Sequence, residues 1–338
     1  MDLRWKTASS PLPRLAAGQE SQKCSQGESE VGIMSFIKAG NRKLEISNED
    51  KVFYPDSGIT KGELVEYYKR AGDMIIPYMK DRPLTMRRFP DGIEGNSFYQ
   101  KNAPKGIPDW IKTEAVKNRE GGTTNHIICN DVATLIFITN YGNITPHIWL
   151  SKLDDLDKPD KIIIDLDPPG DDFKAVRSAV KLIYELLTDE LDLPVFLMLT
   201  GSKGVHVVLP LRPKNKFDEV RDFASELADF LAQNHPRELT TEVRKSKREG
   251  RLFLDVARNA YAQTGVAPYS VRAIENAPVA APVNYGELSD KSMNAQKYNI
   301  KNIFKRMGQV KDPWKEINRH RFSLGRAREK FERLKSKV

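Results

Sequence analysis

The stretch Lys161-Ile162-Ile163-Ile164-Asp165-Leu166-Asp167 decides the fold, because it joins a β-branched run to two carboxylates. Such a run is typical of a strand that is buried on both faces. Residues two apart in a strand point to the same face, so Asp165 and Asp167 should leave the sheet together. Carboxylates this close repel each other unless a cation lies between them. A hard divalent ion such as Mn²⁺ or Mg²⁺ is the natural partner, since it takes oxygen ligands.

A third acid lies downstream in Phe253-Leu254-Asp255-Val256, where Asp255 again interrupts an apolar strand. An isolated Asp in a strand interior is unfavourable without a partner. Asp165, Asp167 and Asp255 therefore predict a site for two divalent ions of the kind that supports phosphoryl transfer. The spacing alone leaves two alternatives open: a plain strand end followed by turn residues, and a carboxylate pair that hydrolyses glycosidic bonds.

The segment Thr200-Gly201-Ser202-Lys203-Gly204-Val205-His206 lies between two apolar strands and is interpreted as a phosphate-binding loop. Its glycines let the backbone approach a ligand, and its N–H groups can form an anion nest. Thr200 and Ser202 add hydroxyls, Lys203 adds a charge, and His206 can bond a phosphate oxygen. The segment is not a Walker A loop, because the four-residue spacer is missing and no helix follows. The alternative interpretation of this segment is a simple hairpin turn. Outside it, His147 lies beside apolar residues, a pattern typical of a buried core histidine.

Apolar periodicity around these motifs predicts an α+β chain with strands in tight pairs. A capping box of Thr60 and Glu63 opens a helix that Pro77 and Pro83 should end. Residues 84–150 have the pattern of short strands and loops, with a hairpin turn at Gly121-Gly122. Further helices are expected at 173–187, capped by Asp171 or Asp172, and at 217–230, with strands at 195–199, 205–209 and 252–257.

The two ends of the chain differ in composition from its middle. Residues 1–33 are polar and lack an apolar period, so we expect a disordered or non-native extension, with order beginning near Leu44. Residues 301–338 hold 13 Lys and Arg against 4 Asp and Glu, an excess larger than the net charge of +8 of the whole chain. Apolar residues are interleaved there, so this basic segment predicts a helix, either solvated or acting as a non-specific DNA clamp.

Length and composition exclude several classes of protein. The 338 residues are 39% hydrophobic and 30% charged, which suits a large buried core and not a disordered chain. No run of 18 apolar residues occurs, so no membrane partner is expected. Cys24 and Cys129 are too few for a disulfide scaffold or a Cys-rich zinc site, and they predict a reducing, cytoplasmic setting.

Taken in order, the three motifs resemble those of the archaeo-eukaryotic primase superfamily. More narrowly, the chain is similar to the end-joining polymerases, namely the polymerase domain of bacterial ligase D and its stand-alone archaeal relatives. The similarity runs from about Leu44 to Leu288. The motif order differs from that of the polymerase β-type nucleotidyltransferases, in which the Gly-Ser motif comes first. Further matching segments are Asp50-Lys51-Val52-Phe53-Tyr54-Pro55, Arg82-Pro83, Ala267-Pro268-Tyr269-Ser270-Val271-Arg272 and Ala281-Pro282.

The resemblance implies a primase-polymerase fold, with mixed or antiparallel central sheets flanked by helices and an RRM-like catalytic subdomain. It implies a catalytic domain at 34–300, with a DNA-end-binding part at 34–150 and a catalytic part at 151–300. The basic helical segment at 301–338 follows it.

The resemblance also implies roles for individual residues. Asp165, Asp167 and Asp255 match catalytic aspartates that bind two Mn²⁺ or Mg²⁺ ions. Lys51 and Lys61 are similar to a lysine pair that holds the 5′-phosphate of the downstream strand. The positions that bind the incoming nucleotide, NTP or dNTP, match Thr200 (where the family usually has Ser), Ser202, Lys203, His206, His147 and Arg272. Positions on the template and DNA side match Arg88, Phe98, Tyr99 and Arg248, the last of which aids end synapsis.

The implied function is a template-dependent nucleotidyltransferase that fills gaps at DNA double-strand breaks in non-homologous end joining. The resemblance adds a preference for ribonucleotides and recognition of a downstream 5′-phosphate. The alternatives are a primase or primase-polymerase that makes primers de novo, and a non-catalytic module that bridges DNA ends. No segment resembles a ligase or nuclease domain, so the expected partners are gapped or 3′-overhang DNA ends with a 5′-phosphate, a Ku-like protein and a separate DNA ligase.

Overall fold

A six-stranded sheet carries the Asp-x-Asp strand at its centre. The computed structural model describes residues 35–337, so the extension predicted for residues 1–33 lies outside the described residues. The strand order is β13-β14-β10-β12-β11-β16, and all neighbours are antiparallel except β13 and β14. The strands are β10 (Lys161–Asp167), β11 (Phe196–Leu199), β12 (Val205–Pro210), β13 (Leu239–Thr240), β14 (Leu252–Asp255) and β16 (Ala281–Val283).

Four of these strands and two helices form a β-α-β-β-α-β unit. Its chain order is β10, α3 (Phe173–Glu185), β11, β12, α4 (Phe217–Asn234) and β14. The first strand lies between the third and the fourth, which is the ferredoxin-like arrangement that RRM domains share. Asp172 caps α3 by accepting from the backbone N–H groups of Lys174 and Ala175. The predicted α+β class and the RRM-like subdomain are confirmed.

The two faces of the sheet have different chemistry because side chains alternate along β10. Ile162, Ile164 and Leu166 are fully buried in the core that α3 and α4 cover. Ile163, Asp165 and Asp167 therefore point to the opposite face, toward the second sheet. The predicted pattern of β10, with both acids on one face, is confirmed.

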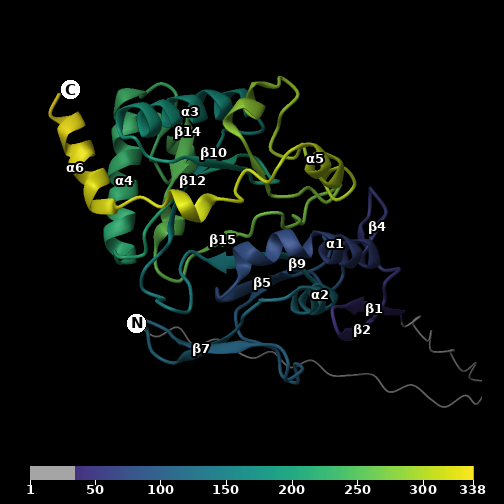
Figure 1. Cartoon of the computed structure of the whole chain (residues 1–338). Helices are drawn as coiled ribbons and strands as arrows, with labels where there is room; N and C mark the ends of the chain where they lie inside the picture. The colour runs from purple at the N-terminus through teal and green to yellow at the C-terminus, as the bar shows by residue number, and fades with distance from the viewer. Residues whose placement is uncertain (1–34, 338) are drawn as a thin grey trace, which may run out of the picture. The chain divides into compact units, whose positions relative to one another are not determined.

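The C-terminal end of the basic segment packs on the helical side of this sheet, beside α4 (Figure 1). Its last helix, α6 (Leu324–Lys335), buries Phe331 completely against Phe223 and Phe230 of α4. Arg326, Lys330 and Arg333 remain exposed. The segment also contains α5 (Ile303–Gln309) and a 3₁₀ turn at Ile317–His320.

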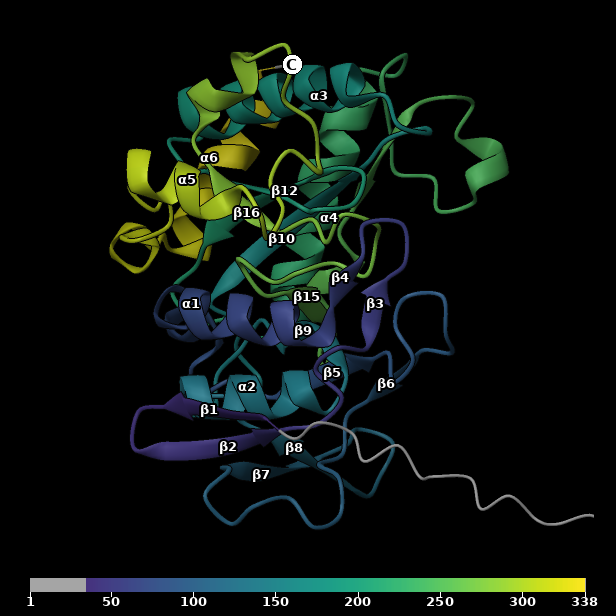
Figure 2. The same ribbon diagram turned by 90° about the vertical axis from the view of Figure 1, so that its right-hand side faces the viewer.

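A second sheet, with the order β15-β9-β5-β6, carries Arg88, Phe98 and Tyr99 and lies against α1 and α2. Figure 2 shows α1 and α2 beside β9 and β5. The strands are β5 (Leu84–Arg88), β6 (Phe98–Gln100), β9 (Asn143–Trp149) and β15 (Thr264–Val266), and the helices are α1 (Lys61–Met79) and α2 (Val132–Asn140).

Two predictions about these helices need correction. The capping box of Thr60 and Glu63 opens α1 as predicted, but the helix continues through Pro77 to Met79, because the Lys80 N–H still bonds to the Ile76 carbonyl oxygen. Helix α2 was not predicted at all. It is apolar on nearly every side and rich in β-branched residues, so it has no helical period and has the composition of a strand.

Short hairpins complete the fold. The Gly121-Gly122 turn joins β7 (Thr113–Lys117) and β8 (Thr123–Ile127), as predicted. The expected start of order near Leu44 is wrong, because β1 (Ser35–Ala39) and β2 (Arg42–Ile46) form a hairpin that buries Ala39 and Ile46 against α2. A third hairpin pairs β3 (Val52–Tyr54) with β4 (Ile59–Thr60). None of the helices within residues 35–337 is long and apolar enough to cross a membrane.

Candidate active site

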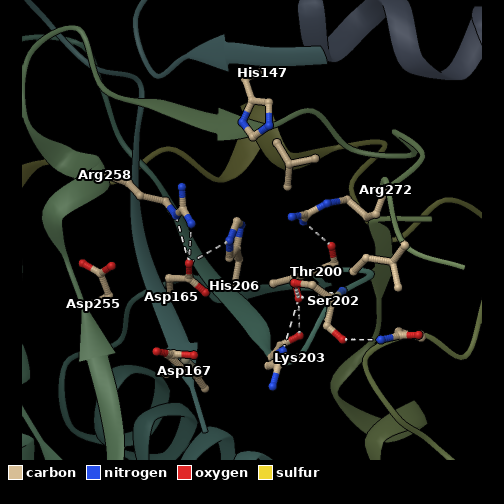
Figure 3. A pocket seen from close by; sticks show the side chains of 15 residues that line it. His147, Asp165, Asp167, Thr200, Ser202, Lys203, His206, Asp255, Arg258 and Arg272 are labelled. Carbon is tan, nitrogen blue, oxygen red and sulfur yellow. Dashed lines mark hydrogen bonds and ion pairs between the residues drawn. The ribbon is translucent and has the colours of Figure 1, made fainter. Parts of the chain in front are cut away.

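A cavity of about 480 Å³ opens where the two sheets face each other. That volume lies in the usual range for small-molecule sites. Figure 3 shows the carboxylates on one side of the cavity, the Thr200–Gly204 loop on the other, and His147 across from both. The structure thus gathers every predicted catalytic and nucleotide-binding residue in one cavity: Asp165, Asp167, Asp255, Thr200, Ser202, Lys203, His206, His147 and Arg272.

The acids come together because β10 and β14 are neighbours in register. Asp165 lies directly opposite Asp255, which places their Cα atoms roughly 4.5–5.5 Å apart. Asp165 accepts hydrogen bonds from Arg258 at 2.7 and 2.9 Å, and its carboxylate lies 3.4 Å from His206 Nε2. Burial would raise the pKa of Asp165, but His206 and Arg258 outweigh it and hold the pKa well below its usual range. Asp165 therefore stays ionised throughout the physiological range.

Sequence reasoning missed Arg258. This residue follows Asp255 by three positions, and a 3₁₀ turn (Ala257–Asn259) brings it back over β10. The Asn259 side chain fixes that turn, because its amide donates to the Ile163 carbonyl at 2.7 Å and accepts from the Ile163 N–H at 2.8 Å. A cation one turn after a strand carboxylate is the signal that could have identified Arg258.

The loop from Thr200 to Gly204 is organised by its own first side chain. The Thr200 hydroxyl accepts from the N–H groups of Ser202 at 3.3 Å and Gly204 at 3.2 Å. These two N–H groups therefore have a partner inside the loop and do not form the open anion nest that was predicted. Lys203 remains exposed, with its ammonium 3.2 Å from Asp171, and Arg272 donates to the Thr200 carbonyl at 2.6 Å.

Gly204 is required where the loop meets the Asp-x-Asp strand. A Cβ on Gly204 would lie well inside van der Waals contact with the Leu166 carbonyl oxygen. The Cβ would be fixed by the backbone of residue 204 and the carbonyl oxygen belongs to the backbone of Leu166, so no side-chain rotation could relieve the clash. The glycine thus allows the loop to approach the strand that carries the acids.

We expect Gly204→Ala to lower the melting temperature by about 5 °C or more, because overpacking costs roughly 1–3 kcal/mol or more. Differential scanning calorimetry measures the shift. Gly286→Ala is the matched control, since a Cβ there meets no atom within 4 Å. Equal melting temperatures for the two variants would show that the close approach has no consequence.

His147 is a buried residue of β9 that faces the cavity from the second sheet. Burial and the nearby Arg272 and Arg258 lower its pKa from 6.5 to about 3. The ring is therefore neutral at physiological pH and offers one donor and one acceptor nitrogen. The exposed Tyr99 of β6 packs edge-on against it, with ring centroids 5.9 Å apart.

The donor set fits Mn²⁺ or Mg²⁺, because three carboxylates on one face supply the oxygen ligands that such ions prefer. Within residues 35–337, no group of three His, Cys, Asp or Glu side chains is already drawn together around one point. Cations pair with two of the three acids instead: Arg258 with Asp165, and Arg248 with Asp167 at 2.8 Å. In addition, the buried Nδ1 of His206 has no hydrogen-bond partner among the described residues.

Lys51 and Lys61 lie together at a second cavity, of about 190 Å³, which we call the phosphate pocket. Lys61 opens α1 and donates to the Ser47 hydroxyl at 3.1 Å, and Lys51 pairs with Asp91 at 2.5 Å. Burial, together with the charge of Lys51, lowers the pKa of Lys61 from 10.5 to about 8. The pocket is also lined by Ser47, Asn48, Phe53, Arg88, Pro90, Asn140, Tyr141 and Gly142.

The pKa of Lys61 predicts a pH dependence of anion binding. The lysine is charged below about pH 8 and loses its proton as the pH rises through that value. A 5′-phosphate has completed most of its second ionisation by about pH 7, so it contributes little change above that pH. We therefore expect the affinity advantage of 5′-phosphorylated over 5′-hydroxyl gapped DNA to fall between about pH 7 and 9.

Fluorescence anisotropy of both DNAs across this range measures the ratio. Lys61→Arg should give a flatter profile, because its guanidinium stays charged. A wild-type ratio that is constant with pH would contradict the assignment.

Phe98 and Tyr99 project from the edge strand β6 as exposed aromatic side chains, with 46% and 61% of their surfaces accessible. The Arg88 guanidinium lies 5.1 Å from the Phe98 ring. Arg88 also lines the phosphate pocket, so the structure places it between the two groups. Arg248 lies apart from them, in the basic loop of residues 244–251 that precedes β14, and its guanidinium packs on the Phe253 ring of β14.

Comparison with known proteins agrees with this geometry. A family model described as "LigD, primase-polymerase domain" matches residues 60–314. The multifunctional non-homologous end joining protein LigD of Pseudomonas aeruginosa is 32% identical over 298 residues, which cover 86% of this chain and 35% of the relative. The bifunctional LigD of Bacillus subtilis is 31% identical over 290 residues, covering 85% and 46%. This chain therefore spans less than half the length of these relatives.

A solved structure supports the same relationship. The polymerase domain from Mycobacterium tuberculosis ligase D, in complex with DNA, superposes with a TM-score of 0.76 at 26% identity. The alignment covers 82% of this chain and 99% of that domain. The resemblance proposed from the motif order is confirmed: the chain belongs to the LigD primase-polymerase domain family of the archaeo-eukaryotic primase superfamily.

Proposed function

We propose that this protein is a template-dependent nucleotidyltransferase that fills gaps at DNA double-strand breaks in non-homologous end joining. The observation that carries the proposal is the single cavity in which Asp165, Asp167 and Asp255 face the Thr200–Gly204 loop. Family membership supports it, as does the phosphate pocket on the N-terminal part of the chain. The two cavities also support a division into a DNA-end-binding part (34–150) and a catalytic part (151–300).

In the proposed reaction, the primer 3′-hydroxyl attacks the α-phosphorus of the incoming nucleotide, and pyrophosphate leaves. Asp165, Asp167 and Asp255 would hold two Mn²⁺ or Mg²⁺ ions, which supply charge stabilisation to the attacking and leaving oxygens. Arg258 pairs with Asp165 and Arg248 pairs with Asp167, so these cations balance the charge of the two carboxylates in the absence of metal. Because the guanidiniums are close to the same cavity, they are positioned to turn toward the anionic substrate.

The remaining cavity residues suit a nucleoside triphosphate. Lys203 and Arg272 supply positive charge for its phosphates, and His206 offers a buried nitrogen that has no partner among the described residues. Burial lowers the pKa of Arg272 to about 10, so it remains charged at neutral pH. We propose that His147, held neutral by its surroundings, donates or accepts a hydrogen bond at the nucleotide's sugar.

The DNA would bind along the second sheet. Lys51 and Lys61 would hold the 5′-phosphate of the downstream strand. The exposed rings of Phe98 and Tyr99 would stack on template bases, a contact worth about 1–3 kcal/mol per base. Arg248 and its basic loop would contact the DNA end during synapsis. The proposed partners are gapped or 3′-overhang ends, a Ku-like protein and a separate ligase.

The test is primer extension across a one-nucleotide gap whose downstream strand carries a 5′-phosphate. We expect faster addition of ribonucleotides than of deoxynucleotides, and faster addition with Mn²⁺ than with Mg²⁺. A template without a primer should give no product. Synthesis on that template would support the primase alternative, and DNA binding without any synthesis would support the end-bridging module.

A further inference from the structure

Tyr141 forms part of the wall of the phosphate pocket, although neither the motifs nor the proposed function assign it a role. It lies at the C-terminal end of α2, and 37% of its surface is exposed. Its ring stacks on Phe137, with an interplanar angle of 7° and centroids 6.2 Å apart. The ring is therefore held in place from the side of the helix.

The Arg88 guanidinium lies directly on the ring of Tyr141. The guanidinium carbon is 3.7 Å from the ring centroid, a close cation–π contact. Arg88 Nε also donates to the Tyr141 carbonyl at 2.8 Å, and Nη1 donates to Gln100 Oε1 at 3.0 Å. Tyr141 and Gln100 thus fix the plane of the guanidinium as well as its place.

The fixed guanidinium connects two groups of DNA-side residues. Arg88 lines the phosphate pocket with Lys51 and Lys61, and its opposite neighbour Phe98 lies 5.1 Å away. Nη2 has no hydrogen-bond partner among the described residues, so that nitrogen can donate to an anion. The pocket volume of about 190 Å³ is several times the roughly 30 Å³ that one water occupies, so a phosphate and part of its sugar fit there.

We propose that Tyr141 is a positioning residue that holds Arg88 as the third cation of the phosphate pocket. Arg88 then binds the 5′-phosphate while it contacts Phe98 on the template side. A phosphate bound in the pocket therefore favours stacking of the template base on Phe98. The proposal rests on the proposed function and extends it to a residue on a different helix.

The test is a thermodynamic cycle measured by anisotropy with two gapped DNAs that differ only in a 5′-phosphate or 5′-hydroxyl. Tyr141→Leu should reduce the affinity for the 5′-phosphate DNA by about 3- to 30-fold more than it reduces the affinity for the 5′-hydroxyl DNA. Tyr141→Phe should behave as wild type, because it keeps the ring. Arg88→Gln should reduce the affinity advantage of the phosphate at least as much as Tyr141→Leu does. The double variant should reduce this advantage no more than Arg88→Gln alone.

Additive losses, or a Tyr141→Leu loss that is equal on both DNAs, would overturn the proposal. Gln100→Leu provides a second route, because it removes the other anchor of Arg88 and should also reduce the phosphate advantage. Melting temperatures of all variants identify any that fail to fold. A wild-type protein without a phosphate advantage would instead contradict the proposed function, so the two failures are distinguishable.

Discussion

Asp165→Asn should reduce the rate of primer extension by about 10³-fold or more. The substitution keeps the size of the side chain but removes the charge that two divalent ions require, and such ions contribute several kcal/mol of transition-state stabilisation. Binding of gapped DNA should remain within about twofold of wild type, because the proposed DNA contacts of Lys51, Lys61, Phe98 and Tyr99 lie outside the cavity that holds Asp165. Single-turnover extension and anisotropy measure the two quantities on the same protein.

The matched control is Asp73→Asn, which removes an exposed carboxylate of α1. It should leave extension unchanged. A melting temperature for each variant is needed, because a neutral amide in place of the Asp165 carboxylate would leave Arg258 and His206 without their anionic partner. Extension by Asp165→Asn at a rate near wild type, with the fold intact, would rule out the metal assignment.

Replacing Lys51 and Lys61 together by Ala should abolish the advantage of a 5′-phosphorylated gap in both affinity and extension. Each charge-assisted hydrogen bond is worth about 1.5–3 kcal/mol, so the loss of two should lower the affinity for the phosphorylated substrate by about 10²- to 10⁴-fold. The 5′-hydroxyl substrate should be affected far less. Extension assays with both substrates at one fixed salt concentration give the ratio.

The control for lost charge is Lys69→Ala with Lys80→Ala, which removes two solvent-accessible lysines of the same helix region. That variant should weaken both substrates equally, through general electrostatics. If the Lys51 and Lys61 double variant keeps the full preference for the phosphate, the pocket binds something else.

The catalytic half of the fold was predictable because its signals are local. Short-range apolar patterns predict the strand β10 and the amphipathic helices α3 and α4. The two glycines, Gly201 and Gly204, mark the turn between β11 and β12. Their order in the chain then pointed to the family, and the cavity brings together all nine predicted residues. The spacing of Asp165 and Asp167 also predicted the face of the sheet on which the site lies.

Other features depend on contacts between distant segments, which a single sequence does not reveal. Arg258 hydrogen-bonds Asp165 because the 3₁₀ turn that carries it is anchored to β10 by the Asn259 side chain. Tyr141 follows a helix that has no periodic pattern, since its residues are buried on nearly every side. The internal hydrogen bonds of the Thr200 hydroxyl were also hidden, because a Thr can equally face a ligand or its own loop.

The most direct test of the central claim is single-nucleotide addition on four gapped duplexes that differ only in the templating base. Each duplex carries a primer 3′-hydroxyl and a downstream 5′-phosphate, and all four nucleotides compete in one reaction. If the cavity is a template-directed polymerase site, the complementary nucleotide is added to each duplex. Addition of the same nucleotide to all four duplexes, or of none, would contradict the account.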